Sequence, residues 1–468
     1  MRRLRRRWPP WCVGMLAAMM VATGCSGGSP PVPSAAPSGA VTETPLPTSM
    51  PDPLPTYGPS ETPTDIVAPS VTPTPTVSPR VTPTPTPQPK PRAPKPPPPK
   101  PPAPAPATLD RAVWVHLFDG SLKTREGIAR VVERLDGARA TAIVAEVVRR
   151  HDAYYDSDVL PRTSDPAFEP GLDVLATLIS EAHAAGLEVH AWIPVAPTWH
   201  AAYDGLAAPA DWLPAEHGLA APERDRWVTR TVDGAWTEYL DPALPEVRAH
   251  VAAVVREIAE DYDVDGIHLD YVRYASQRHG YHPRALARYR EATGTTATPP
   301  PDDAAWSRWR RAQVDALVAD AGRAIDAAGS DAVLSAAVIA WGDGPGGSVV
   351  RDFEDTAAFR EALQDWEGWA ERDLVDVLVP MDYFREADAQ QSAWLRRWLD
   401  YQAGLERRTG TPVVPGIAGY LNSPRDALTQ VGLADARLGS VAVYSYQGST
   451  NDPERPLWAS LAASDWGG

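Results

Sequence analysis

The sequence is poor in cysteine, and this scarcity sets the first constraint on the fold. Of 468 residues only two are cysteine, Cys12 and Cys25. Both lie within the first 25 residues, so the rest of the chain can form no internal disulfide. The folded part must therefore be held together by its hydrophobic core alone.

Basic residues and metal-ligand patterns are also scarce. The chain carries 44 Lys and Arg against 60 Asp and Glu, a formal net charge of −16. Nucleic-acid binding requires a basic footprint, so this composition argues against a nucleic-acid partner. No zinc-ligand spacing is present among His183, His190, His200 and His217. We therefore expect no metal and no other cofactor.

The N-terminal apolar stretch is too short to cross a bilayer. Trp11–Ala22 follows five arginines within residues 1–7 and falls short of the ~20 apolar residues that a spanning helix needs. This arrangement predicts a secretory signal over residues 1–24. The small residues before Cys25 resemble a bacterial lipobox, although such motifs usually carry leucine where this chain has Ala22. We expect an exported protein, lipid-anchored through Cys25 to the bacterial cell membrane and facing the cell wall or exterior; ordinary secretion is the alternative.

Residues 25–108 lack the apolar side chains that a core requires. Thr-Pro repeats lie near Thr72–Pro87, and Lys95–Pro102 is almost entirely proline. Such composition favours extended polyproline II over a packed domain. We expect a disordered tether that holds the folded part away from the membrane. The alternative is that the tract is a ligand for a proline-binding partner.

Residues 109–468 alternate short apolar runs with segments of helical periodicity. The expected strands are Arg111–Phe118, Thr141–Val148, Leu187–Pro194, Asp263–Tyr274, Val333–Ala340, Val375–Phe384, Pro412–Tyr420 and Gly439–Gln447. Expected helices include Leu172–Ala185, Pro245–Tyr262, Pro283–Ala292, Ala304–Ala328, Ala357–Ala370 and Ser392–Arg407, and the segment 195–240 is expected to be irregular. Eight βα units in about 360 residues predict an α/β fold, a (β/α)8 TIM barrel in a single domain, and we expect a monomer. A doubly wound sheet is the rival, but no glycine-rich phosphate turn follows the first strand.

The expected strand Asp263–Tyr274 carries the strongest signal of a functional site. Side chains alternate across a strand, so His268 and Asp270 share one face while Ile267 and Leu269 take the other. Ionisable groups at the C-terminal end of a buried strand are where α/β barrels place their chemistry. The alternative is that Asp270 caps the following loop or helix.

Carboxylates and aromatic rings end several other expected strands, and this combination suits the hydrolysis of a glycosidic bond. One carboxylic acid protonates the leaving oxygen, a second carboxylate acts as nucleophile or base, and flat rings hold the sugars. We expect Asp270 to be the nucleophile or base. The acid is expected to be Glu146 or Asp382, because burial raises a carboxyl pKa. Alternatively, Glu146 forms a structural ion pair with a neighbouring arginine, and Asp382 caps a loop.

The residues expected to contact sugar share a position near the expected strand ends. Trp192, Trp341 and Tyr383 are candidates for stacking on sugar rings, with burial in the core as the alternative. His190 and His268 are expected to orient carboxylates and sugar hydroxyls. The full set of substrate-binding candidates is His190, Trp192, His268, Arg273, Trp341, Tyr383, Tyr420 and Tyr446.

The chain resembles the glycosyl-hydrolase-like family ten of bacterial surface proteins. The matching stretches are Val147–Pro161, Glu181–Trp192, Leu240–Arg248, Val264–Asp270, Val377–Tyr383 and Gly416–Tyr420. This resemblance implies a (β/α)8 barrel and hydrolase activity on glycans, with bacterial cell-wall or other extracellular polysaccharide as substrate. Tyr271 departs from the family, many members of which have a second aspartate at this position. Val272 stands where family-eighteen chitinases, whose strand is similar, carry their acid, which argues against chitinase chemistry.

The sequence thus predicts an envelope-anchored glycoside hydrolase that acts on a glycan partner. Two other classes stay open. The domain could be a catalytically silent glycan-binding module displayed on the tether, in which case Asp270 would form hydrogen bonds without reacting. It could also be a structural surface lipoprotein.

Overall fold

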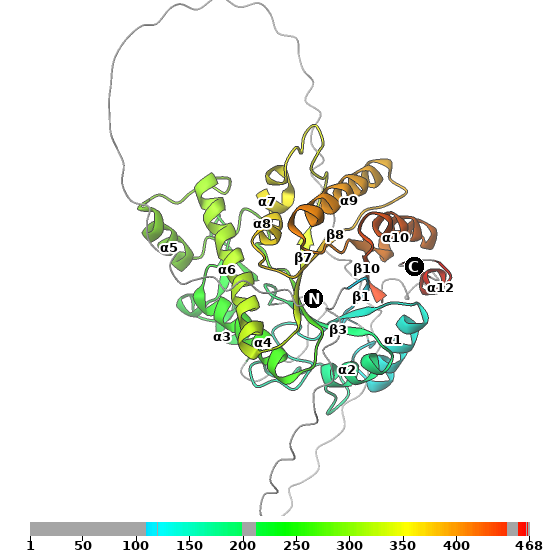
Figure 1. Cartoon of the computed structure of the whole chain (residues 1–468). Coiled ribbons are helices and arrows are strands. Elements are labelled where there is room, and N and C mark those ends of the chain that lie inside the picture. The colour runs from blue at the N-terminus through cyan, green and yellow to red at the C-terminus, as the bar shows by residue number, and fades with distance from the viewer. Residues whose placement is uncertain (1–108, 119, 199–211, 447–456, 465, 467–468) are drawn as a thin grey trace, which may run out of the picture. The chain divides into compact units, whose positions relative to one another are not determined.

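The barrel predicted from the sequence is confirmed. The computed structural model describes residues 109–118, 120–198, 212–446, 457–464 and 466. Within them, eight parallel strands close into a barrel in the order β1-β10-β9-β8-β7-β6-β3-β2 (Figure 1). The strands are β1 (Arg111–Val115), β2 (Ala142–Glu146), β3 (Glu188–Pro194), β6 (Gly266–Asp270), β7 (Val333–Ile339), β8 (Val377–Asp382), β9 (Gly416–Ala418) and β10 (Val441–Tyr444). The signal, Cys25 and the tether, expected in residues 1–108, lie outside the described residues.

Helices form the layer outside the barrel (Figure 1). The longer ones are α1 (Arg125–Gly137), α2 (Val174–Ala184), α4 (Pro245–Asp261), α5 (Pro283–Thr293), α6 (Ala304–Ala328), α9 (Ala389–Thr409) and α10 (Pro424–Leu438). The shorter ones are α3 (Leu213–His217), α7 (Ala357–Arg360), α8 (Trp366–Glu371) and α12 (Leu457–Ala462), with 3-10 turns at η2 (Glu223–Asp225), η3 (Phe353–Asp355) and η4 (Gly419–Leu421). None of the described helices is long and apolar enough to cross a bilayer.

Local sequence explains where these helices begin and end. Thr124 and Asp303 accept a hydrogen bond from a backbone N–H in the first turn of α1 and α6, as N-cap residues do. Gly410 ends α9 in the left-handed conformation, which glycine adopts without steric cost. The single helix expected over Ala357–Ala370 is instead two, α7 and α8. Leu363, between them, has a positive φ of 55°, which interrupts helical geometry.

Alternation along the strands separates the barrel interior from the outer core. On β2, Ile143 and Ala145 belong to the main hydrophobic cluster, and Glu146 therefore points to the opposite, interior face. On β6, Ile267 and Leu269 belong to the same cluster, while His268 and Asp270 face inward. β2 and β6 thus deliver polar side chains to the inside of the barrel while their other faces pack in the hydrophobic core.

The segment 195–240 contains a β-hairpin, which the sequence analysis did not predict. The strands β4 (Val228–Arg230) and β5 (Trp236–Leu240) pair antiparallel. Their turn contains Gly234, whose φ of 89° suits glycine. Backbone hydrogen bonds join β5 to the segment that follows β3. Leu240 N donates to Ala196 O at 2.8 Å, and Thr198 N donates to Glu238 O at 2.8 Å. The hairpin is therefore attached to the rim of the barrel.

Candidate active site

Two buried carboxylates occupy the ends of strands on either side of β3. Glu146 is the last residue of β2 and pairs in register with Trp192, while Asp270 is the last residue of β6 and pairs with Pro194. Glu146 is fully buried and Asp270 is 6% exposed. The charge of Asp270 raises the pKa of Glu146, so the two carboxylates interact. The structure thus brings the two residues together at the C-terminal ends of the barrel strands, which we call the mouth.

Glu146 is held in place by residues that follow β1 and β2. Its Oε2 accepts a hydrogen bond from the Leu117 backbone N–H at 2.9 Å, and its Oε1 pairs with the Arg149 guanidinium. Burial raises its pKa from 4.5 to about 7, against the opposing effects of Arg149 and the Leu117 N–H. Near neutral pH the protonated and ionised forms are both populated, as general acid–base catalysis requires. The guanidinium of Arg149 favours the ionised form of Glu146, and burial favours the protonated form more strongly.

Asp270 is fixed by the chain that follows it. Its Oδ1 accepts a hydrogen bond from the Tyr271 backbone N–H at 2.6 Å. Tyr271 adopts a φ of 52°, a left-handed conformation that costs a non-glycine residue about 1 kcal/mol or more. Burial raises the pKa of Asp270, and the Tyr271 N–H and the Arg273 charge lower it. Backbone strain is therefore located next to the carboxylate that the sequence singled out.

A cluster of tyrosines lines the mouth beside the carboxylates. The ring of Tyr444, at the end of β10, lies 5.4 Å from that of Tyr383 and 6.0 Å from that of Tyr420. Trp192 approaches the same ring edge-on at 6.3 Å. Burial raises the pKa of Tyr383, and the charge of Asp270 adds to that rise, so this cluster lies near the Asp270 carboxylate. The predicted contacts Trp192, Tyr383 and Tyr420 thus gather at the mouth.

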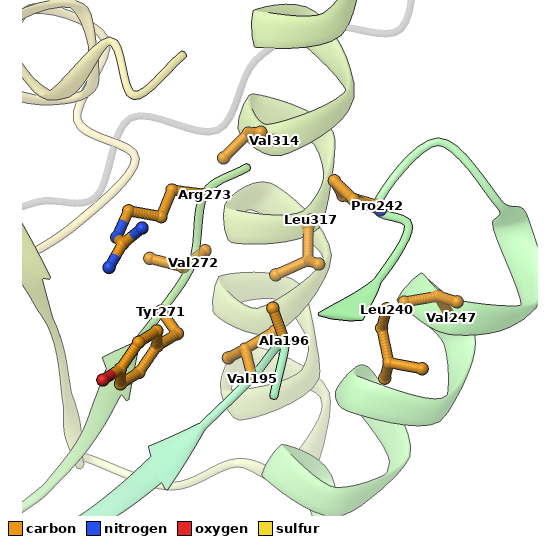
Figure 2. A pocket seen from close by; sticks show the side chains of 10 residues that line it. All are labelled: Val195, Ala196, Leu240, Pro242, Val247, Tyr271, Val272, Arg273, Val314 and Leu317. Carbon is orange, nitrogen blue, oxygen red and sulfur yellow. The ribbon is translucent and has the colours of Figure 1, made fainter. Parts of the chain in front are cut away.

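The segment after β6 directs alternate side chains to different sides. Val272 is buried in the main hydrophobic cluster, to which Val314 of α6 also belongs, whereas Tyr271 and Arg273 on either side of it are half-buried. Figure 2 shows these residues beside α6, among those that line one pocket. The apolar pocket drawn there lies behind the mouth, between this segment and α6. The Arg273 guanidinium lies 5.0 Å from the centre of the Tyr271 ring and 5.2 Å from that of Trp341. Arg273 and Trp341 therefore join Tyr271 at the rim of the mouth.

The two predicted histidines lie inside the barrel rather than at the mouth. The indole N–H of Trp114 donates to His268 Nε2 at 3.2 Å, and His268 Nδ1 lies 2.9 Å from Ser335 Oγ. Burial lowers the pKa of His268 to about 3, so the ring is neutral. His190 Nε2 lies 3.3 Å from Glu188 Oε2. These histidines brace the barrel interior, and their described partners are other interior side chains rather than the two carboxylates.

Two predicted residues lie away from the mouth, and we remove them from the candidate site. Asp382 faces α9, where both of its carboxylate oxygens accept from Gln402 Nε2, at 3.0 and 2.9 Å. Alternation explains this, because Tyr383 takes the mouth face and Asp382 the outer one. Tyr446 stacks on Trp458 of α12, with ring centroids 5.9 Å apart, as part of the outer core.

The structure identifies the arginine that pairs with Glu146 and adds His116, which the sequence did not single out. Arg149 pairs with Glu146, and its guanidinium lies over the Phe118 ring. His116, two residues beyond Trp114, reaches the Tyr444 ring at 6.4 Å. Period-two alternation from β1 would have placed His116 inward. Arg149, three residues beyond Glu146, is the neighbouring arginine whose ion pair the sequence offered as the alternative role of Glu146. In the part of the chain that the structure describes, no group of three or more His, Cys, Asp or Glu is arranged to hold a metal ion.

This arrangement defines the class of protein. A pair of buried carboxylates, one with a pKa near neutrality, stands among aromatic rings at the C-terminal mouth of a TIM barrel, which is the equipment of a glycoside hydrolase. Residues 108–425 match the family described as Glycosyl hydrolase-like 10, and the chain belongs to this family.

Two relatives of this chain are named glycosyl hydrolases. The chain is 25% identical over 331 residues to glycosyl hydrolase DigH of Escherichia coli (strain K12), covering 67% of this chain and 72% of the relative. It is 26% identical over 297 residues to glycosyl hydrolase YngK of Bacillus subtilis (strain 168), covering 58% and 54%.

Two solved structures share the fold. They are the PgaB (BpsB) glycoside hydrolase domain from Bordetella bronchiseptica, with a TM-score of 0.51 and 16% identity, and the β-amylase catalytic domain from Paenibacillus polymyxa, with 0.56 and 12%. Each match covers 76% of this chain and 98% of the other.

Proposed function

We propose that this protein is an envelope-anchored glycoside hydrolase that cleaves a cell-wall or other extracellular polysaccharide, with Glu146 and Asp270 as its reacting carboxylates. The observation that carries the proposal is the buried pair itself. The pKa of Glu146 is raised to about 7 by burial, and Asp270 lies close enough to contribute to that rise. A carboxylic acid that is partly protonated near neutrality, beside a second carboxylate, suits glycosidic cleavage.

The chemistry assigns a different role to each carboxyl group. Glu146 donates its proton to the glycosidic oxygen as the bond to the anomeric carbon breaks. Asp270 attacks the anomeric carbon or removes a proton from the attacking water, and Glu146 is reprotonated before the next turnover. Arg149, paired with Glu146, stabilises the carboxylate that remains after proton donation. Tyr383 and Tyr444 supply ring faces against which a sugar can be positioned.

The envelope location rests on the N-terminal sequence. The arginine-rich start, the short apolar stretch and Cys25 favour lipidation after export, and the proline-rich residues that follow favour a tether. An enzyme held in this way reaches polymers near the membrane, which supports cell-wall glycan as the substrate class.

The test compares the full chain with three variants on defined glycans. Peptidoglycan, peptide-free peptidoglycan glycan and a panel of β-linked polysaccharides are incubated with each protein, and released oligosaccharides are followed by mass spectrometry. We expect Asp270→Asn and Glu146→Gln each to lose at least about a hundredfold in turnover on the polymer that the wild type cleaves. Asp382→Asn is the matched control: it changes a buried carboxyl on the outer face and should leave turnover unchanged.

Two results would overturn the proposal in different ways. Turnover that survives both Asp270→Asn and Glu146→Gln would place catalysis outside this pair. Retained glycan binding without turnover by the wild type would make the domain a silent binding module.

A further inference from the structure

The hairpin of β4 and β5 presents one aromatic side chain to the mouth. Tyr239 of β5 is half-buried, and its ring centroid lies 6.5 Å from that of Tyr271, the residue that follows Asp270. The same ring lies 6.5 Å from that of His279. Neither the sequence analysis nor the family match assigns a role to the hairpin.

The opposite face of β5 already supplies the packing that holds the hairpin. Leu240 is buried in a small cluster with Leu213, Val228 and Val247. The backbone bonds of β5 to Ala196 and Thr198 attach the hairpin to the barrel. Tyr239 alternates to the other face and takes no part in that cluster. Its ring therefore lies outside the cluster that packs the hairpin and faces Tyr271 and His279 instead.

A contact between rings connects Tyr239 to Tyr271, the residue that follows Asp270. Burial raises the pKa of Tyr271, and the nearby Asp270 and Tyr239 both add to that rise. The Arg273 guanidinium lies 5.0 Å from the centre of the Tyr271 ring and 5.2 Å from that of the Trp341 ring, so Arg273 connects these two rings. Tyr239, Tyr271, Arg273 and Trp341 are all partly exposed, so their surfaces can be reached by a ligand.

We propose that Tyr239 forms a remote sugar-binding subsite, linked through Tyr271 to the reacting carboxylates. This inference rests on the proposed function and deepens it. A glycan cleaved at Asp270 would continue over the hairpin, with a sugar ring beyond the scissile bond stacked on Tyr239. The enzyme therefore prefers long glycan chains over the shortest oligosaccharides that it can cleave. The β4–β5 insertion is the part of the chain that sets this preference.

The test is the dependence of kcat/KM on chain length. Peptide-free peptidoglycan glycan and β-linked N-acetylglucosamine oligomers, each separated by size, are offered to the full chain and its variants. Tyr239→Ala should lower kcat/KM roughly three- to tenfold on long chains, the scale of one lost aromatic contact, and leave the shortest cleaved oligomer unaffected. Tyr239→Phe keeps the ring and should behave as the wild type. Glu238→Ala alters the exposed neighbouring position on β5 and is the matched control.

The possible failures are distinguishable. If the wild type cleaves these glycans and Tyr239→Ala lowers kcat/KM equally on short and long chains, the ring supports Tyr271 rather than a subsite, and the inference is overturned. No change on any length overturns it as well, while the proposed function stands. If the wild type cleaves nothing, binding of the same size-separated glycans is measured instead. An affinity that rises with chain length and is lost in Tyr239→Ala would support the subsite. An affinity that does not depend on length or on Tyr239 would overturn it.

Discussion

Glu146→Gln distinguishes a proton donor from a carboxylate locked to Arg149. Burial raises the pKa of Glu146 from 4.5 in the unfolded chain to about 7 in the folded protein. Between these two pH values the folded state holds a proton that the unfolded state releases, so the free energy of unfolding falls as the pH rises. The difference corresponds to about 3 kcal/mol, fully present below the unfolded pKa and lost above the folded one.

Glutamine cannot ionise, and its amide has the shape of the protonated acid. We expect wild type and Glu146→Gln to have similar stability in urea near about pH 4.5, and the variant to be more stable by up to about 3 kcal/mol near about pH 8. Glu133→Gln, at an exposed position on α1, serves as the control and should show no such trend. A difference between Glu146→Gln and wild type that is constant across this pH range would refute the reasoning. It would show that Glu146 stays ionised and acts as a structural partner of Arg149.

Three further predictions concern Arg149, His268 and Cys25. Arg149→Gln removes the cation that lowers the pKa of Glu146, so the pH at which kcat falls should rise by about one to three pH units. Arg149→Lys keeps the charge and should leave that pH unchanged. An unchanged pH profile in Arg149→Gln would contradict the role of Glu146 as acid. His268, whose pKa burial lowers to about 3, should show no imidazole titration by NMR between about pH 5 and 8, and a titration there would argue against its buried contacts with Trp114 and Ser335. Cys25→Ser should move the protein from the membrane fraction to the soluble fraction of cells, and a variant that stays with the membrane would refute anchoring through Cys25.

The barrel was predictable because its strands are short apolar runs separated by helices with clear periodicity. The same alternation identified Asp270 and Glu146, since each ends a strand whose other face is apolar. The exact ends of the strands were harder to predict from the sequence. β10 ends at Tyr444, so Tyr446 lies beyond the mouth and packs on α12.

The remaining parts of the site depend on contacts that are distant in sequence or on irregular backbone. Tyr444 at the end of β10 contacts Tyr383, which follows β8, and no local sequence pattern specifies a contact between two distant strands. The strands of the hairpin are short and only partly buried, so β5 shows no strong period-two signal and Tyr239 could not be placed. The left-handed turn at Tyr271 is likewise invisible in a sequence that carries no glycine there.

The most direct test of the central claim is hydrolysis of the cleaved glycan in heavy-oxygen-labelled water. We expect each new reducing end formed by the wild type to carry one labelled oxygen, because water completes the reaction at the anomeric carbon next to Asp270. Asp270→Asn should form almost no labelled ends under the same conditions. Products without label, or labelled ends formed equally by Asp270→Asn, would contradict the assignment of hydrolysis to this pair of carboxylates.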